Sequence, residues 1–306
     1  NEVTLPSGVT EIGKDAFASS GFEKIVFGEN VKTIEVGSQG VFYHTDNLKS
    51  VAILGKDTVI GGTLVAFCDS VKEIILNKDT ETITDQLVSF SSAVDTVKLY
   101  DPKTKKLIGN DGEAWLPAGM TEIPQLLFSN ANSLKTVVMN DAVTTFEKRT
   151  FCVCPSLTTI KTYKTDENGE FIKDENDNIV LSGNDNEVRL PSALTTVTDG
   201  LLYNTPVTTV IFTGNSLKSI VSKTFELNKS LATVKYVSGV DEAGNEIIVG
   251  NEGEAWLPEG VESVGATILK DSLVRKVVLP STLTQLGSDT ALTTGTFYGN
   301  TALQEV

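Results

Sequence analysis

The stretch LPSGVTEIGKDAFASSGFEKIVF, from Leu5 to Phe27, contains the pattern that decides the fold. It returns as LPAGMTEIPQLLFSNANSLKTVVM from Leu116 and as LPSALTTVTDGLLYNTPVTTVIF from Leu190. The copies share the frame L-P-x-x-V-T-x-I-x-x-x-x-F, a short spacer, and then L-x-x-I-x followed by an apolar residue that opens the next unit. A frame that recurs in this way indicates one supersecondary unit used repeatedly.

The spacing of the frame predicts how the units assemble. Ile53, Leu76 and Leu99 open successive units 23 residues apart, and we count ten units, the last of which runs to Val306. Each unit ends in an alternating stretch such as VKEIIL or LKTVVM, which is typical of a strand with one buried face. A second short strand, VTEI or VKTI, follows. Because one unit cannot bury its apolar face alone, we expect a mainly β repeat solenoid, a single domain over residues 1–306.

A bulky residue in the middle of each unit is expected to fill the centre of the coil. Phenylalanine stands at this position in most units, and its large apolar ring is suited to an interior that stacked coils enclose. The phenylalanines that we assign to the core in this way are Phe17, Phe42, Phe67, Phe90, Phe128, Phe151, Phe225 and Phe297.

Three segments interrupt the repeat after a strand, at about residues 100–115, 161–189 and 237–256. Each has a polar turn signal (DPKTKK, DENGE or DEAGNE) between short alternating arms, which predicts a β-hairpin. Each ends in a related string, GNDGEAW, GNDNEVR or GNEGEAW, before the frame resumes at Leu-Pro. We interpret this string as the seam between hairpin and solenoid, with Gly-Asn as the turn and the acidic residues in solvent.

The closest matches to a known family are IGKDAF (Ile12–Phe17) and FCVCPSL (Phe151–Leu157). With these, the chain resembles the BspA-like leucine-rich repeat family, a bacterial variant with a period near 23 residues, and Cys154 stands at the family's cysteine position. The resemblance implies a right-handed leucine-rich-repeat coil, an extracellular or cell-surface location in a bacterium, and adhesion or binding to host or partner proteins. The family has no shared catalytic residues, so the resemblance implies a non-enzymatic protein without a cofactor.

Composition narrows the range of partners. The chain has 25 Lys+Arg against 40 Asp+Glu, a formal net charge of −15, which repels phosphate backbones and argues against nucleic acid. No run approaches the ~18 apolar residues of a membrane helix, so we expect no membrane insertion of this segment. Both ends fall inside the repeat, and we therefore expect a piece of a longer protein, monomeric by itself.

Basic side chains gather at the outward positions of the main strands, where they form a candidate binding strip. Outward positions alternate with buried ones along a strand, and here they hold nine basic and four acidic residues, with Thr at many others. Such a strip on an acidic rod can attract an acidic protein, or it can simply keep an exposed sheet soluble. The candidate residues are Lys24, Lys49, Lys72, Lys98, Lys135, Lys161, Lys235, Arg275 and Lys276.

Trp115 and Trp256 hold matching positions before Leu-Pro. Exposed tryptophans can stack on a sugar or anchor a protein partner. Because the third copy has Arg189 at this position, we favour a structural role, in which the side chain covers the joint where the hairpin rejoins the coil.

A calcium site is conceivable at residues 174–185, where Asp174, Asn176 and Asn178 match positions 1, 3 and 5 of an EF-hand loop. The glycine of position 6 is replaced by Ile179 and the final glutamate by Asp185. We therefore prefer a solvated acidic turn and assign no metal site.

The remaining reactive side chains give no sign of catalysis. His44 is the only histidine and stands in no triad-like context. Three cysteines, two of them at i and i+2, do not form a disulfide framework, and we interpret Cys68, Cys152 and Cys154 as small buried residues. The sequence thus favours a protein-binding solenoid. The alternatives are a spacer that presents another domain and, less favoured, a glycan-binding module.

Overall fold

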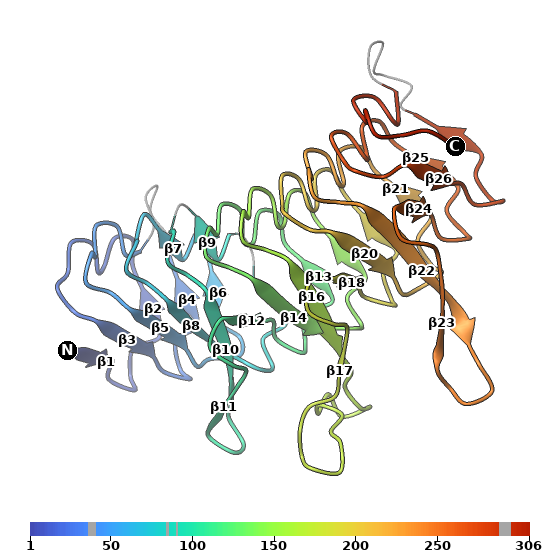
Figure 1. The fold of residues 1–306 in the computed structure, drawn as a ribbon. Helices are drawn as coiled ribbons and strands as arrows, with labels where there is room; N and C mark the ends of the chain where they lie inside the picture. Colours follow the sequence, from blue (N-terminus) through green and yellow to red (C-terminus); the bar gives the residue numbers. More distant parts are fainter. Residues whose placement is uncertain (36–40, 84–85, 90, 288–294) are drawn as a thin grey trace.

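The computed structural model describes residues 1–35, 41–83, 86–89, 91–287 and 295–306, and it shows a β-solenoid (Figure 1). Its main sheet has 16 strands, 13 of which form one ladder along the solenoid. All neighbours in this ladder are parallel, as stacked coils require. In order, the ladder strands are β1 (Glu2–Thr4), β3 (Lys24–Phe27), β5 (Ser50–Ile53), β8 (Glu73–Asn77), β10 (Thr96–Asp101), β12 (Glu113–Trp115), β14 (Thr136–Asn140), β16 (Thr159–Tyr163), β18 (Val188–Leu190), β20 (Thr209–Phe212), β22 (Thr233–Val240), β24 (Glu254–Trp256) and β26 (Lys276–Val278).

A second side of the coils carries short parallel strands, as the VTEI and VKTI stretches predict. They form sheets of six, three and two strands. The six-stranded sheet contains β13 (Glu122–Ile123), β15 (Thr145–Phe146), β19 (Thr196–Val197), β21 (Ser219–Ile220), β25 (Ser263–Val264) and β27 (Gln285–Leu286). The smaller sheets are β2 (Glu11–Ile12), β4 (Thr33–Ile34) and β6 (Val59–Ile60), and β7 (Val65–Ala66) with β9 (Val88–Ser89).

The third side of the coils is built from turns, and no helix occurs among the described residues. Several coils have two residues with positive φ four positions apart, such as Arg149 and Val153 (56° each). These turns still hydrogen-bond along the solenoid, since the backbone N–H groups of Arg149, Phe151 and Val153 donate to carbonyl groups of the next coil. The described residues therefore contain no helix that is long and apolar enough to cross a membrane.

One hydrophobic core runs through the stacked coils, from Ile12 to Val277. Four of the assigned phenylalanines are fully buried in it, and Phe17 and Phe297, near the two ends, are partly buried. Aromatic packing continues from coil to coil, for example between Phe128 and Phe151, whose ring centroids lie 6.2 Å apart. The core assignment is therefore confirmed for Phe42, Phe128, Phe151 and Phe225.

The assignment of Phe67 to the core is wrong. Phe67 is 51% exposed and has a φ of 54°, and the fully buried Val65 takes the central position two residues earlier. In the coil of Phe151, the residue with positive φ likewise lies two positions after the core residue, at Val153. The frame is therefore shifted by two residues in the coil of Phe67. Phe90 lies outside the described residues.

The three predicted hairpins project from the same side of the solenoid (Figure 1). We name them hairpin 1 (residues 100–115), hairpin 2 (161–189) and hairpin 3 (237–256). Their return strands are β11 (Lys106–Ile108), β17 (Leu181–Ser182) and β23 (Glu246–Val249), each antiparallel to the ladder strand before it.

The string at the end of each hairpin is more than a seam, because it forms a ladder strand itself. The three strands β12, β18 and β24 lie at these strings and pair in parallel with the ladder strands on both sides. The ladder therefore contains these three strands in addition to those of the ten repeat units.

Candidate functional site

The three strings have the same internal hydrogen bonds, which hold each of them in one shape. The amide Nδ2 of Asn110 donates to Glu113 Oε2 (2.9 Å), and that of Asn251 donates to Glu254 Oε2 (3.0 Å). In the third copy Asn184 donates to Glu187 in the same way (3.2 Å). These asparagine and glutamate side chains thus have a structural role, because they hydrogen-bond to each other within the string.

The leading acid of each string forms an ion pair with an outward lysine of the preceding ladder strand. Nζ of Lys98 lies 2.6 Å from Asp111 Oδ1, and Nζ of Lys161 lies 2.7 Å from Asp185 Oδ1. Lys235 and Glu252 form the equivalent pair in hairpin 3. These acids lie in solvent as expected, with 77–89% of each side chain exposed, and each also lies beside a cation of the ladder.

The ion pairs shift the pKa of three groups, Lys98, Asp185 and Glu252. The hydrogen bond from Lys98 to Asp111 raises the pKa of this lysine. Hydrogen bonds from Lys161 and Lys235 lower the pKa of Asp185 and Glu252, respectively. All these groups are therefore charged at neutral pH, and the positive charge of the strip is locally neutralised.

Two further residues of the predicted basic strip are also paired. Lys49 contacts Glu23 (2.9 Å) and Lys276 contacts Glu305 (2.8 Å). Including the pairs at the strings, five of the nine candidates have a carboxylate partner. The four that form no ion pair with any described residue are Lys24, Lys72, Lys135 and Arg275.

The register of the ladder separates the paired lysines from one another. Lys161 lies opposite Val138 on one side, and Lys235 lies opposite Ile211. Apolar side chains thus interrupt the row of cations, and the face does not carry one continuous positive strip.

Trp115 covers the base of hairpin 1. It is 4% exposed, its ring stacks on Tyr163 at a centroid distance of 5.9 Å, and Phe171 of hairpin 2 packs edge-on against it at 6.5 Å. Its Nε1 donates to Glu113 Oε2 (2.7 Å). Burial raises the pKa of Tyr163, whose hydroxyl donates to the carbonyl of Leu116. The favoured structural role agrees with these contacts.

Trp256 has a similar hydrogen bond but a different environment. Its Nε1 donates to Glu254 Oε2 (2.6 Å), yet it is only partly buried. No aromatic ring packs against it among the residues that the structure describes. The two tryptophans are therefore equivalent in sequence but not in burial.

Hairpin 2 has two tight turns, one at the DENGE signal and one at the acidic turn that begins at Asp174. Isolated bridges join Thr165 to Phe171 and Lys173 to Ile179. In the second turn Asp174 Oδ1 accepts the backbone N–H groups of Asn176 and Asn178. The residues of the calcium hypothesis thus serve to close a turn.

Asp166 and Asp241 close their turns by the same contacts as Asp174. These hydrogen bonds, from Asn178 for Asp174 and from Asn245 for Asp241, lower the pKa of the carboxyl group. In the described part of the chain no three His, Cys, Asp or Glu side chains gather as potential metal ligands.

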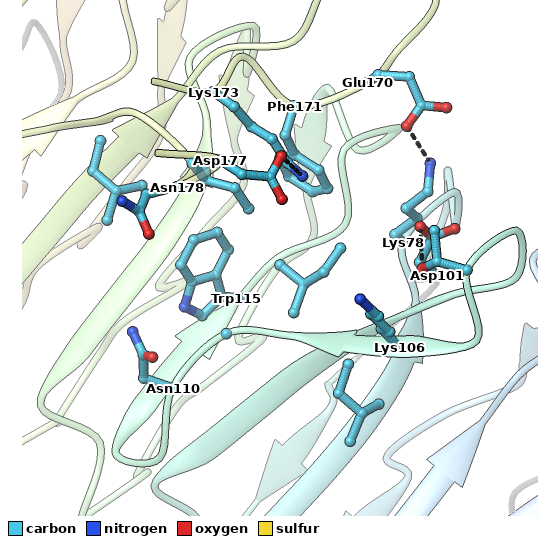
Figure 2. Close-up of a pocket in the computed structure, with 16 residues that line it drawn as sticks. Lys78, Asp101, Lys106, Asn110, Trp115, Glu170, Phe171, Lys173, Asp177 and Asn178 are labelled. Carbon is cyan, nitrogen blue, oxygen red and sulfur yellow. Dashed lines mark hydrogen bonds and ion pairs between the residues drawn. The ribbon is translucent and has the colours of Figure 1, made fainter. Parts of the chain in front are cut away.

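Hairpins 1 and 2 contact each other around a cavity of about 680 Å³ (Figure 2). Lys103, in the turn of hairpin 1, pairs with Glu170 of hairpin 2. Glu170 also lies 3.3 Å from Nζ of Lys78, a 2% exposed side chain whose other partner is Asp79 (2.9 Å). Burial lowers the pKa of Lys78, but the two carboxylates outweigh this effect and raise it, so the lysine stays charged.

Hairpins 2 and 3 are connected in a similar way, around a smaller cavity of about 320 Å³. Arg189, at the end of hairpin 2, is 5% exposed and pairs with Glu246 of β23. At the other end of the row, hairpin 1 is fastened to an early coil by Lys105, which lies 2.9 Å from Glu29. The hairpins are therefore held by ion pairs and do not hang free.

Exposed aliphatic residues gather on the hairpins, a feature that the charged and reactive residues of the sequence do not indicate. Of the twelve large hydrophobic residues exposed in the described part of the chain, six lie there. The corresponding signal in the sequence is the run of aliphatic residues in the hairpin arms, which by itself predicts only strands. The six are Leu107, Ile172, Val180, Val240, Ile247 and Ile248.

The thiols and the imidazole are not arranged for catalysis. All three cysteines are buried and free, as predicted. Burial raises the pKa of Cys68 to about 11 and that of Cys154 to about 12, so both are protonated thiols at neutral pH. His44 is exposed and lies against the ring of Tyr43.

Comparisons with known proteins agree with this fold. The family model described as "BspA type Leucine rich repeat region" matches six copies, over residues 1–111, 113–174 and 182–254. A search of the curated proteins gives no match.

Among solved structures, the chain is similar to a leucine-rich repeat protein from Bacteroides ovatus (19% identity, 94% of this chain and 74% of that one, TM-score 0.46). It is also similar to a leucine-rich repeat protein from Eubacterium ventriosum (15% identity, 97% and 82%, TM-score 0.42). The pneumococcal vaccine antigen PcpA is a third (15% identity, 94% and 68%, TM-score 0.47). Since the family model covers well over half of the residues, this chain belongs to the BspA type leucine-rich repeat family.

Proposed function

We propose that this solenoid is a non-enzymatic bacterial surface or extracellular protein that binds another protein through its row of three hairpins. The observation that supports this proposal most is the concentration of exposed aliphatic residues on the hairpins, where Leu107 is 49%, Val180 47% and Ile247 46% exposed. Exposed apolar residues clustered on one side of a protein are typical of an interaction surface.

The fixed position of the hairpins supports the same proposal. Ion pairs fasten hairpin 1 to Glu29 and connect the three hairpins to one another. A surface that is already ordered loses little conformational entropy when it binds, which favours affinity. Family membership is compatible with a surface repeat protein.

The ladder face is the second candidate surface. Its four unpaired cations, Lys24, Lys72, Lys135 and Arg275, would attract an acidic protein. We rank it below the hairpins because carboxylates of this chain already neutralise the other five candidates.

Two matched triple variants separate these surfaces. The hairpin variant is Leu107→Lys, Val180→Lys and Ile247→Lys, and the ladder variant is Lys72→Glu, Lys135→Glu and Arg275→Glu. Binding to a panel of immobilised extracellular-matrix and cell-surface proteins is measured by surface plasmon resonance. We expect the hairpin variant to lose at least about tenfold in affinity, because ~1.4 kcal/mol at the centre of an interface suffices for this.

The ladder variant is expected to change the affinity by less than about threefold, since exposed charges mainly alter association rates. Both variants should keep the wild-type melting temperature within a few degrees, because the substituted side chains are exposed. Salt-sensitive binding that only the ladder variant loses would move the site to the ladder face. If the wild-type protein binds no member of the panel, the result would favour a spacer that presents another domain.

A further inference from the structure

Hairpin 3 differs from the other two hairpins because nothing in the described structure follows it. Hairpin 1 is contacted by hairpin 2 through Lys103 and Glu170, and hairpin 2 is contacted by hairpin 3 through Arg189 and Glu246. On the far side of hairpin 3 the described residues form no further hairpin (Figure 1). Hairpins 1 and 2 are thus each contacted by the hairpin that follows, whereas no hairpin follows hairpin 3 in the described structure.

The exposed side of hairpin 3 is a free strand edge. In the register, β23 pairs only with β22, from Tyr236↔Val249 to Val240↔Glu246. Among the described residues no other strand pairs with it, so every second backbone N–H and C=O group on its outer edge has no protein partner. Such an edge is a template for another strand.

The side chains around this edge are apolar. Ile247 and Ile248, which point to opposite faces of the strand, are both 46% exposed, and Val240 on the neighbouring strand is 64% exposed. Hairpin 1 and hairpin 2 offer no comparable pair on their return strands, since Leu107 is the one exposed large aliphatic residue of β11 and Leu181 of β17 is partly buried.

The charge of the hairpin narrows the kind of strand that fits. Residues 237–256 contain five acidic and no basic residues, and Asp241 and Glu242 at the tip are exposed. Glu246 is already paired with Arg189, but Glu242 forms no ion pair within the described structure. A partner strand with basic residues is favoured here, whereas a second copy of the same acidic hairpin is disfavoured by like charge.

We propose that β23 binds an extended segment of a partner protein by strand addition, and that this segment carries β-branched residues on both faces together with lysine or arginine. The proposal deepens the proposed function, on which it rests. Main-chain hydrogen bonds to the free edge of β23 provide affinity, and the two isoleucines select β-branched side chains on both faces. The acidic tip of the hairpin then favours a basic segment.

The test uses the whole chain and a synthetic probe, the blocked octapeptide Lys-Val-Thr-Val-Lys-Ile-Thr-Lys. Affinity is measured by fluorescence anisotropy, and the site is located by hydrogen exchange of the backbone amides. We expect slower exchange within Glu246–Val249 on addition of the peptide. A peptide with the same side chains but N-methylated at alternate residues should bind at least about tenfold more weakly, because it cannot complete the ladder.

The protein variant Ile248→Lys is compared with Val59→Lys, whose original side chain is about equally exposed on β6, outside the hairpins. We expect Ile248→Lys to weaken peptide binding at least about fivefold and Val59→Lys to leave it within twofold. Equal binding of the N-methylated peptide, protection elsewhere in the chain, or equal effects of the two variants would overturn strand addition at β23. Protection of β23 in a peptide-free dimer, detected by sedimentation, would assign the edge to a second copy instead.

These outcomes are distinguishable from failure of the proposed function. If the hairpin variant loses its protein partner while the peptide experiments fail, hairpin binding stands and strand addition is refuted. If the peptide binds β23 but the hairpin variant keeps all its partners, strand addition is a property of this edge and the wider hairpin surface is refuted.

Discussion

Two tryptophans in matching strings show how much the environment of a residue decides its energetic role. Trp115 stacks on Tyr163 and meets Phe171, because hairpin 2 follows it along the solenoid. Trp256 has the same hydrogen bond to the glutamate two positions earlier, but among the described residues no following hairpin covers it. The same sequence string therefore produces a core residue in one place and a partly exposed one in the other.

We expect Trp115→Ala to lower the free energy of unfolding by about 3–5 kcal/mol, the range for a large buried aromatic residue. Trp256→Ala should cost about 1–2 kcal/mol, because less of its surface is buried. Urea unfolding followed by circular dichroism measures both values. Equal losses for the two variants would contradict the difference in burial.

At the scale of the coil, the phenylalanine of the frame is not always the residue that fills the core. In the coil of Phe67 the smaller Val65 takes this place, and Phe67 lies at a position with positive φ and points outward. The sequence could not reveal this shift, because VAFCDS fits the frame with the phenylalanine in either role. The stacking of neighbouring coils selects the register that keeps Cys68 buried beside the carbonyl of Phe42.

This register leads to a paired prediction. Phe128→Ala removes a fully buried ring, and we expect it to lower the free energy of unfolding by about 3–5 kcal/mol. Phe67→Ala removes an exposed ring and should cost no more than about 1 kcal/mol. Chemical denaturation with both variants measures the difference, and a large loss for Phe67→Ala would restore the original assignment of this residue to the core.

At the scale of the whole molecule, carboxylates with lowered pKa are spread along the solenoid. Hydrogen bonds from lysines, turn N–H groups or a tryptophan N–H hold them ionised. Their ordinary pKa values are 3.8 for Asp and 4.5 for Glu. The carboxyl groups concerned are those of Glu23, Glu29, Asp101, Asp166, Glu170, Asp174, Asp185, Asp241, Glu252 and Glu254.

A folded-state pKa below the ordinary value stabilises the fold above that ordinary value, and this stability is lost as the pH falls through the folded-state pKa. We therefore expect a constant melting temperature from about pH 7 to 5 and a decrease below about pH 4.5. The double variant Asp185→Asn and Glu252→Gln should show a shallower decrease than the control Glu242→Gln, whose carboxylate is exposed and forms no ion pair in the described structure. A melting temperature that rises on acidification would mean that relief of the −15 net charge dominates.

The candidate surface could be predicted only in part. The sequence indicates three hairpins and an alternating pattern in their arms, but not that the hairpins project from one side and contact one another. It also presents nine basic residues as a strip, although five of them are neutralised. The pairs at the strings join Lys98 to Asp111, Lys161 to Asp185 and Lys235 to Glu252. Because the two partners are separated by a different number of residues in each pair, the sequence does not show that the three pairs are equivalent.

The sequence by itself determined the repeat, the buried face of the ladder strands, the burial of the cysteines and the places where hairpins leave the coil. These features are local, because period-2 apolar spacing and turn residues act on neighbouring positions of one chain segment. The tertiary structure alone decided that the acidic strings become ladder strands, that Trp115 is covered while Trp256 is not, and that β23 keeps a free edge. These features depend on which coils and hairpins lie side by side, because the contacts that produce them join residues of different units.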